Sequence, residues 1–429
     1  MKAISRKSAL RGRAIVPGSK SHTIRAVLLA AMSEGTSVIQ NPLPSQDGKS
    51  ALEAAAVFGS KVTVDGETWI IGGKGKKLQL PENYLECGNS GSVSAFAAPM
   101  AGLIDGYTFV TGDAQIRRRP IRPIVDAINA LGGTAFHTHK GSIACPIVVG
   151  GVMKGGQVHF DGKLSQMVSG IMMTAPLLEK DTEIFVETPR EKPYLDITLE
   201  WVKRHGVTIE NSNDYKYFRI KGNQAYKPCD TTIASDWSGV AFPVVAGIVT
   251  DSEIIVDALD FNDSQGDKAV IDYLIAMGAD IIKDFENNRL IVKGGRSYTS
   301  GITVDLSDTP DSLPALSVAA AYATGKTVFT GLAAVRLKET DRVAVMESEL
   351  KKMGANVETG EDYMIVSGGR QLKGAEVESH HDHRIAMAMM VCGLFAKGDT
   401  IVNDAESCIV SFPTFFDMMK GLGADITQE

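Results

Sequence analysis

Six stretches of the chain are apolar at nearly every position and lack the polar stripe that a surface helix shows. A helix with such a pattern is surrounded by protein, so we expect six short core helices. All six are shorter than the roughly 18 apolar residues that a membrane span needs, so we expect no membrane-spanning segment. The stretches read AVLLAAM, VSAFAAPMAG, VSGIMMTAPLL, VAFPVVAGIV, PALSVAAAYA and IAMAMMVCGLFA.

A glycine follows each core stretch, at the point where a second, amphipathic segment ends. Glycine at such a point is typical of the left-handed residue that terminates a helix. Successive glycines are 73, 74, 72, 76 and 69 residues apart, and only His205 replaces the apolar residue that otherwise precedes them. The glycines are Gly59, Gly132, Gly206, Gly278, Gly354 and Gly423.

Short apolar strands led by Thr or Ser repeat with the same period, at intervals of 72, 74, 70, 75 and 73 residues. Two markers with one period predict six copies of one unit. Each unit reads as an apolar helix, a strand, an amphipathic helix and one or two further strands, which is an α/β (α+β) pattern. The strands begin at Thr36, Thr108, Thr182, Ser252, Thr327 and Thr400.

Composition narrows the function classes. With 44 Lys and Arg against 51 Asp and Glu the net charge is −7, which argues against a nucleic-acid partner. Five scattered cysteines without a CxxC pair predict free thiols in a reducing, cytoplasmic compartment, with neither zinc nor disulfides. The basic start, residues 1–13, lacks the apolar segment of a secretory signal.

The starts of the core helices combine capping residues with nearby basic side chains. A helix N-terminus carries roughly half a positive charge and unpaired N–H groups, which suit an anion. A charge run usually marks a solvated face, but here cations recur at or near helix starts in separate units, so we expect a phosphate- or carboxylate-bearing ligand. The cations are Lys20, Arg25, Arg117, Arg118, Arg119, Lys192, Arg336, Lys338, Arg342 and Arg384.

Four motifs in this order make the sequence resemble the enolpyruvyl transferases, and within them the 5-enolpyruvylshikimate-3-phosphate synthase family. They are PGSKSHTIRA (Pro17–Ala26), GDAQIRRRPI (Gly112–Ile121), LKETDR (Leu337–Arg342) and DHRIAMA (Asp382–Ala388). The resemblance implies a two-domain inside-out α/β barrel with three of the six βαβαββ-like units in each domain. Residues 1–15 and 234–429 would form one discontinuous domain and residues 16–233 the other, with the active site in the cleft between them.

The resemblance also implies the reaction. The synthases transfer the carboxyvinyl (enolpyruvyl) group of phosphoenolpyruvate to the 5-hydroxyl of shikimate 3-phosphate and release phosphate, in the shikimate pathway to chorismate and the aromatic amino acids. No metal or organic cofactor takes part. We further expect a monomer, and competition between glyphosate and phosphoenolpyruvate near Gly91.

By resemblance, Lys20, Arg119, Arg342 and Arg384 hold phosphoenolpyruvate, since these side chains suit carboxylate and phosphate. The reaction delivers one proton and removes another, and the candidates for these steps are Asp311 and Glu339, with the two roles left open. Lys20 and His383 are further catalytic candidates. The remaining candidate substrate-binding residues are Ser21, Arg25, Asn89, Gly91, Ser165, Gln166, Tyr194, Asp311 and Lys338.

Several positions depart from the pattern of the synthases, mostly on the acceptor side. Leu164 stands where a small polar residue is common, and Glu191 replaces a Ser that helps to bind the shikimate phosphate, where a carboxylate would repel it. The other departures are Ala95-Phe96, Gln46-Asp47 and Val410. These departures leave open a relative that carboxyvinylates a different hydroxylated acceptor.

Two further alternatives remain. The sister enzyme acting on UDP-N-acetylglucosamine typically carries a reactive Cys in the loop that here reads Gly112–Gln115, and no Cys lies there. Repeated α/β units can also form clamps or scaffolds without catalytic activity. Such a scaffold predicts basic residues along one continuous surface, whereas the KETDR and DHR clusters favour an enzyme.

Overall fold

The computed structural model describes residues 1–296 and 298–429. The chain divides into two compact units. Unit 1 contains Met1–Pro17 and Ala234–Glu429, and unit 2 contains Gly18–Ile233. The boundaries expected from the sequence are 15/16 and 233/234, and those of the structure are 17/18 and 233/234.

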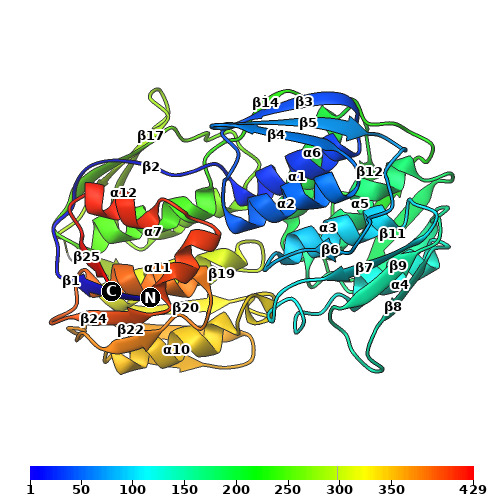
Figure 1. The fold of residues 1–429 in the computed structure, drawn as a ribbon. Helices are drawn as coiled ribbons and strands as arrows, with labels where there is room; N and C mark the ends of the chain where they lie inside the picture. Colours follow the sequence, from blue (N-terminus) through cyan, green and yellow to red (C-terminus); the bar gives the residue numbers. More distant parts are fainter. Residues whose placement is uncertain (297) are drawn as a thin grey trace. The chain divides into compact units, whose positions relative to one another are not determined.

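Unit 2 alternates helices and short strands (Figure 1). Its helices are α1 (Lys20–Ala31), α2 (Gln46–Val57), α3 (Gly91–Ala101), α4 (Arg122–Ala130), α5 (Ser165–Thr174) and α6 (Lys192–Arg204). Its strands are β3 (Glu34–Gln40), β4 (Lys61–Asp65), β5 (Thr68–Lys74), β6 (Leu85–Glu86), β7 (Tyr107–Thr111), β8 (Thr134–His137), β9 (Ile147–Gly150), β10 (Gly156–Phe160), β11 (Thr182–Val186), β12 (Glu210–Asn211), β13 (Tyr217–Ile220) and β14 (Thr231–Thr232).

Unit 1 has the same alternation and includes both ends of the chain. Its helices are α7 (Trp237–Val249), α8 (Ala269–Ala276), α9 (Leu313–Tyr322), α10 (Arg342–Lys352), α11 (His383–Gly393) and α12 (Phe415–Gly421). Its strands are β1 (Lys2–Arg6), β2 (Arg11–Ile15), β15 (Glu253–Asp257), β16 (Asp280–Asp284), β17 (Arg289–Lys293), β18 (Thr299–Ser300), β19 (Thr303–Asp305), β20 (Thr324–Thr330), β21 (Asn356–Thr359), β22 (Tyr363–Gly368), β23 (Glu376–Glu378), β24 (Thr400–Asn403) and β25 (Asp425–Gln428).

Across the described residues the strands form six sheets, and each sheet contains a path of four strands with one parallel pair followed by two antiparallel pairs. In one of the six sheets a fifth strand, β19, also pairs in parallel with β20. In unit 2 the orders are β14-β3-β5-β4, β6-β7-β9-β8 and β10-β11-β13-β12. In unit 1 they are β2-β15-β17-β16, β18-β20-β22-β21 and β23-β24-β1-β25. The last strand before the chain leaves each unit pairs with a strand of the same unit, since β2 joins β15 in unit 1 and β14 joins β3 in unit 2.

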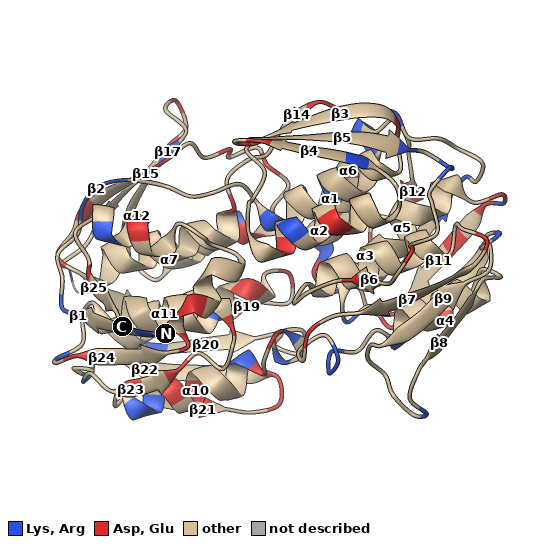
Figure 2. Ribbon diagram, viewed as in Figure 1, with Lys and Arg blue, Asp and Glu red and all other residues tan. Residues whose placement is uncertain are grey.

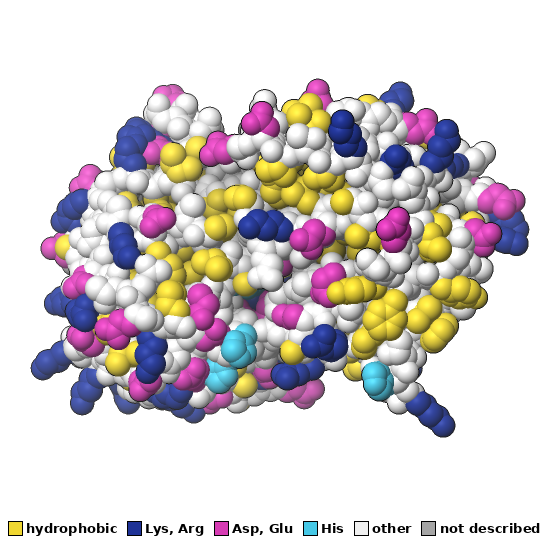
Figure 3. Space-filling view, in the orientation of Figure 1, with side chains coloured by type: hydrophobic (Ala, Val, Ile, Leu, Met, Phe, Trp, Pro, Cys, Tyr) yellow, Lys and Arg dark blue, Asp and Glu magenta, His cyan; other side chains and the backbone are white. Residues whose placement is uncertain are grey.

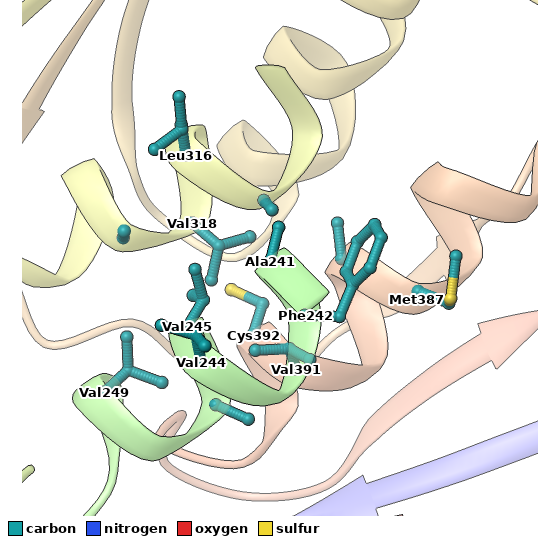
Figure 4. Close-up of a cluster of buried hydrophobic side chains, with 14 of the residues drawn as sticks. Ala241, Phe242, Val244, Val245, Val249, Leu316, Val318, Met387, Val391 and Cys392 are labelled. Carbon is teal, nitrogen blue, oxygen red and sulfur yellow. The ribbon is translucent and has the colours of Figure 1, made fainter. Parts of the chain in front are cut away.

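The core of each unit is built on its apolar helices, as the sequence predicts. Helices α3, α5 and α7 carry no charged residue and are tan along their length in Figure 2. All 13 residues of α7 are buried. Figure 4 shows α7, α9 and α11 packed together through Val244, Val245, Leu316, Val318 and Val391. These contacts give each helix an apolar surrounding on every side, which explains the absence of a polar stripe.

The six marker glycines confirm the predicted helix ends. Each has a positive φ between 85° and 98° and directly follows the C-cap residue of an amphipathic helix. Only glycine adopts this conformation without strain, so the period of the sequence reflects a repeated backbone requirement.

One sheet of unit 2 has an apolar outer face. Phe109, Val148 and Phe136 form one row across β7, β9 and β8, and Tyr107 lies in the next row. Hydrophobic side chains gather over these strands in Figure 3.

Among the described residues, no helix combines the length and apolarity required to cross a membrane.

Candidate functional site

Arg342, the first residue of α10, is the centre of a buried charge cluster in unit 1. Its Nη1 lies 2.8 Å from Oδ1 of Asp311, its Nη2 2.6 Å from Oε2 of Glu339, and its Nε 2.7 Å from Oδ2 of Asp382. Burial lowers the pKa of Arg342, but the surrounding carboxylates outweigh burial and raise this pKa above its ordinary value. Arg342 therefore stays charged and orients three carboxylates.

Asp311 is shared by three cations. It lies in the 3-10 turn η3 (Pro310–Ser312) that precedes α9. Besides Arg342, Arg384 reaches it with Nη2 at 3.0 Å from Oδ2, and Lys338 with Nζ at 3.7 Å from Oδ1. Three neighbouring positive charges stabilise the ionised form of this carboxylate.

Arg384 connects the starts of two core helices. Asp382 caps α11 by accepting a hydrogen bond from the backbone N–H of Arg384, with 2.8 Å between N and Oδ1. The Nη2 of Arg384 donates to Oγ of Ser238 on α7 at 2.8 Å. Asp236 caps α7 through the backbone N–H of Ser238. The starts of α7, α10 and α11 therefore meet around the same charges.

Three histidines close together in the chain, His380, His381 and His383, have separate surroundings. His383 is buried as the first residue of α11. His380 lies with Nε2 3.2 Å from Oε1 of Glu349, and His381 with Nδ1 2.8 Å from Oδ2 of Asp404. Within residues 1–296 and 298–429 no three His, Cys, Asp or Glu side chains group as a metal site would require.

In unit 2, Lys20 is the first residue of α1. Ser19 caps this helix by accepting a hydrogen bond from the backbone N–H of His22. The Nζ of Lys20 lies 3.3 Å from Oδ2 of Asp47, in the first turn of α2. Ser21 follows and is half-buried. The start of α1 thus places a partly buried ammonium group beside the backbone N–H groups of a helix N-terminus.

Arg25 is buried one turn further along α1. Its Nη1 donates to the carbonyl of Ser21 at 3.0 Å, its Nη2 to the carbonyl of Tyr194 at 3.1 Å, and its Nε to Oγ1 of Thr198 at 2.9 Å. The guanidinium carbon lies 4.8 Å from the centre of the Phe96 ring, a cation–π contact. Burial lowers the pKa of Arg25 to about 9. Phe96, one of the departures from the pattern of the synthases, therefore contacts and stabilises the Arg25 guanidinium directly.

Gly91 and Arg119 meet at the start of α3. A Cβ atom on Gly91 would lie only 2.6 Å from Nη2 of Arg119, so the guanidinium rests against the bare backbone of this residue. Asn89 donates from Nδ2 to Oδ2 of Asp113 at 2.6 Å, which ties the preceding turn to the loop that carries Arg119. Because residue 91 is a glycine, the guanidinium of Arg119 can reach the start of α3.

The start of α5 corrects one prediction. We expect a side-chain cap at every core helix, but α5 and α9 have none from their own N-cap residues, Leu164 and Ser312. Ser165 is instead the first residue of α5, and Gln166 follows it half-buried. Glu191 supplies the missing acceptor, because its Oε2 lies 2.9 Å from the backbone N and 2.8 Å from Oγ of Ser165.

The predicted residues therefore form two groups, one in each unit. His383 directly precedes one residue of the unit 1 cluster in the chain. The five predicted residues that meet in this cluster are Asp311, Lys338, Glu339, Arg342 and Arg384. The others lie at the starts of α1, α3, α5 and α6: Lys20, Ser21, Arg25, Asn89, Gly91, Arg119, Ser165, Gln166 and Tyr194.

Sequence reasoning missed four polar partners in these groups. Asp382 stands inside the DHR motif, so its pairing with Arg342 could have been suspected there. Asp47 and Glu191 stand out in the sequence only as departures from the pattern of the synthases, and Ser238 only as part of a helix start. Their partners could not be read from the sequence, because these lie 26 to 146 residues away.

The profile of one protein family, described as EPSP synthase (3-phosphoshikimate 1-carboxyvinyltransferase), matches residues 4–419. A 3-phosphoshikimate 1-carboxyvinyltransferase of Ruminiclostridium cellulolyticum is 41% identical over 420 residues, which cover 98% of each chain. A protein of the same name from Methanocaldococcus jannaschii is 39% identical over 428 residues, covering 99% of this chain and 98% of the other.

Solved structures are similar over the whole chain. The EPSP synthase of Acinetobacter baumannii superimposes with a TM-score of 0.84 at 28% identity, covering 100% of both chains. The enolpyruvyl transferase NikO of Streptomyces tendae gives a TM-score of 0.79 at 16% identity, covering 99% of this chain and 98% of NikO, and this likeness concerns the fold alone. The mixed α/β fold is therefore that of these structures.

Proposed function

Because the chain belongs to the EPSP synthase (3-phosphoshikimate 1-carboxyvinyltransferase) family, we propose roles for its charged residues in the reaction of that family. The protein is a transferase that moves the enolpyruvyl group of phosphoenolpyruvate to shikimate 3-phosphate in the shikimate pathway. The observation that carries our assignment of roles is the cluster of three carboxylates and three cations around Arg342.

Cations at helix starts hold phosphoenolpyruvate. Lys20 and Arg119 do so in unit 2, and Arg342 and Arg384 in unit 1. Guanidinium groups can grip a carboxylate or phosphate through two hydrogen bonds, and helix N-termini add N–H dipoles of the same sign. As the carbon–oxygen bond to phosphate breaks, these cations stabilise the charge that develops on the leaving group.

Asp311 and Glu339 carry the two proton transfers. The Asp311 and Glu339 side chains keep exposures of 14% and 9%, whereas that of Asp382 is fully buried, so only the first two offer oxygens to a substrate. Asp311 lies among three cations that favour its carboxylate form, and only this form can take the proton from the 5-hydroxyl. Glu339 contacts Arg342 and, in its protonated form, delivers a proton to the methylene carbon. Asp382 positions Arg342, and His383 assists near the departing phosphate.

We assign acceptor binding to the helix starts of unit 2 and to Asp311 and Lys338 of unit 1. The placement of the unit 2 residues supports this: Ser165 and Gln166 begin α5, and Arg25 on α1 donates to the carbonyl of Tyr194 on α6. The acceptor-binding residues are Ser21, Arg25, Ser165, Gln166, Tyr194, Asp311 and Lys338. Asn89 and Gly91 complete the phosphoenolpyruvate side by supporting Arg119.

At the level of the fold, we propose the inside-out barrel of six repeated units, three in each domain. The common pairing pattern of the six sheets supports this arrangement. We further propose a cytoplasmic monomer without nucleic-acid or membrane partners.

The direct test is phosphate release from phosphoenolpyruvate in the presence of shikimate 3-phosphate. Asp311→Asn and Glu339→Gln should each lower kcat by roughly two to four orders of magnitude, as loss of a general acid or base does. In D₂O, Glu339→Gln should also slow deuterium incorporation into the methylene group. Normal kcat in either variant would contradict the role of that carboxylate.

A further inference from the structure

Glu191 is fixed in an unusual position between α5 and α6. It is the N-cap residue of α6, and its backbone has a φ of +54°, in the left-handed region that few non-glycine residues adopt. The residue is only 2% exposed. A buried carboxylate on a strained backbone persists only where its surroundings hold it firmly, so this side chain is an ordered part of the acceptor region.

The carboxylate of Glu191 occupies a helix start. The Ser165 backbone N–H and hydroxyl both donate to Oε2, at 2.9 and 2.8 Å. Leu164 provides no cap of its own, whereas Ser19 and Ser90 cap α1 and α3 with their hydroxyl groups. The anion that the N-terminal end of α5 stabilises is therefore already present and comes from the protein itself.

The charge of the Glu191 carboxylate acts on a nearby cation, the guanidinium of Arg25. Arg25 donates to the carbonyl groups of Ser21 and Tyr194 and to the hydroxyl of Thr198, all of which are neutral. The negative charge of Glu191 opposes the effect of burial on Arg25. An additional anion at this place would therefore meet a cation whose field is partly compensated.

We propose that Glu191 is a specificity-determining residue whose carboxylate holds the position at the start of α5 that the acceptor phosphate requires. This inference rests on the proposed role of Ser165 in acceptor binding. To bind shikimate 3-phosphate, the protein must move the Glu191 carboxylate away from Ser165, which weakens the affinity for the phosphorylated acceptor. Phosphoenolpyruvate, held by other helix starts, is unaffected.

The test uses the full-length protein with Glu191→Gln and Glu191→Ser. Glutamine keeps the size and one acceptor oxygen but removes the charge, and serine removes both charge and bulk. We expect the KM for shikimate 3-phosphate to fall roughly tenfold in both variants, because one charge repulsion is removed. The KM for phosphoenolpyruvate should stay within about twofold of the wild-type value. The control is Glu179→Gln, an exposed carboxylate beyond the other end of α5, which should change neither constant.

Calorimetric titration of shikimate 3-phosphate without phosphoenolpyruvate separates this inference from the proposed function. Tighter binding in Glu191→Gln supports the inference whether or not turnover is seen. Equal or weaker binding in that variant, with a thermal unfolding midpoint like that of the wild type, overturns it. If Glu191→Ser fails to fold, Glu191→Gln decides the outcome. Absence of turnover in the wild-type protein would contradict the function and leave the binding comparison intact.

Discussion

Arg342 and Asp382 form a two-point ion pair at the junction of α10 and α11, with Nε 2.7 Å from Oδ2 and Nη2 3.2 Å from Oδ1. The two residues are 40 positions apart in the chain, and both side chains are essentially inaccessible. Since Asp382 also caps α11, this pair determines how the start of one helix is oriented toward the other.

We expect Asp382→Asn to destabilise the protein strongly. Breaking a buried ion pair by removing one partner typically costs about 3–5 kcal/mol, and the two carboxylates that remain at Arg342, Asp311 and Glu339, offset only part of this loss. Urea unfolding measures the loss. Asp399→Asn is the matched control, because Asp399 pairs with Arg6 at the surface and such pairs contribute roughly 1 kcal/mol or less. Equal losses in the two variants would contradict the structural role of Asp382.

Arg119→Ala and Arg384→Ala should each lower kcat/KM for phosphoenolpyruvate by two orders of magnitude or more, about 3 kcal/mol of transition-state stabilisation. Steady-state kinetics with phosphate detection checks this. Arg118→Ala removes the same charge from an exposed neighbour of Arg119 and should leave kcat/KM unchanged. Near-wild-type turnover in Arg119→Ala or Arg384→Ala would exclude that residue from its proposed role.

Gly91→Ala should raise the KM for phosphoenolpyruvate by roughly tenfold, about 1.4 kcal/mol, while the KM for shikimate 3-phosphate changes little. The added methyl group would lie 2.6 Å from Nη2 of Arg119, so the guanidinium must shift. The same shift should alter competition by glyphosate. Gly421→Ala is the control, since a Cβ there meets nothing within 4 Å. An unchanged KM would mean that Arg119 relaxes without affecting substrate binding.

Acid should destabilise the protein through His205. Burial lowers the pKa of His205 from 6.5 to about 4, and its Nδ1 donates to the carbonyl of Lys227. Since the unfolded chain binds a proton more readily, stability is complete above about pH 6.5 and falls by about 3 kcal/mol as the pH drops to about 4. Urea unfolding between pH 7 and pH 4 measures this slope.

The variant His205→Gln keeps an N–H donor but cannot titrate in this range, so its stability should depend less on pH. The exposed His139 provides the control, because His139→Gln should leave the wild-type slope in place. Identical slopes in all three proteins would show that His205 is not the group responsible.

The local features of the fold could be predicted because each depends on residues close together in sequence. Gly59 and its five counterparts end helices through a backbone conformation that glycine alone adopts freely. The caps at Ser19 and Ser90 act within three residues. The buried helices follow from composition alone, since α7 contains no charged residue.

The partners of the candidate site residues could not be predicted in the same way. The sequence predicts that Arg342 binds substrate, but the association of Arg342 with Asp311, Glu339 and Asp382 depends on three separate chain segments. Glu191 reads from the sequence as a charge that would repel phosphate, and its contact with Ser165 depends on how α6 begins. No periodicity encodes such long-range pairs.

The chain leaves and re-enters unit 1 at neighbouring points, because the N–H of Asp236 donates to the carbonyl of Pro17 at 2.9 Å. On the other side, a Cβ on Gly18 would lie 3.2 Å from Ile233. Unit 2 is therefore an insertion with adjoining ends. Joining residue 17 directly to residue 234 would give a shorter polypeptide, and joining residue 233 to residue 18 would close unit 2 into a ring. Each product would contain both partners of every strand pairing described for that half.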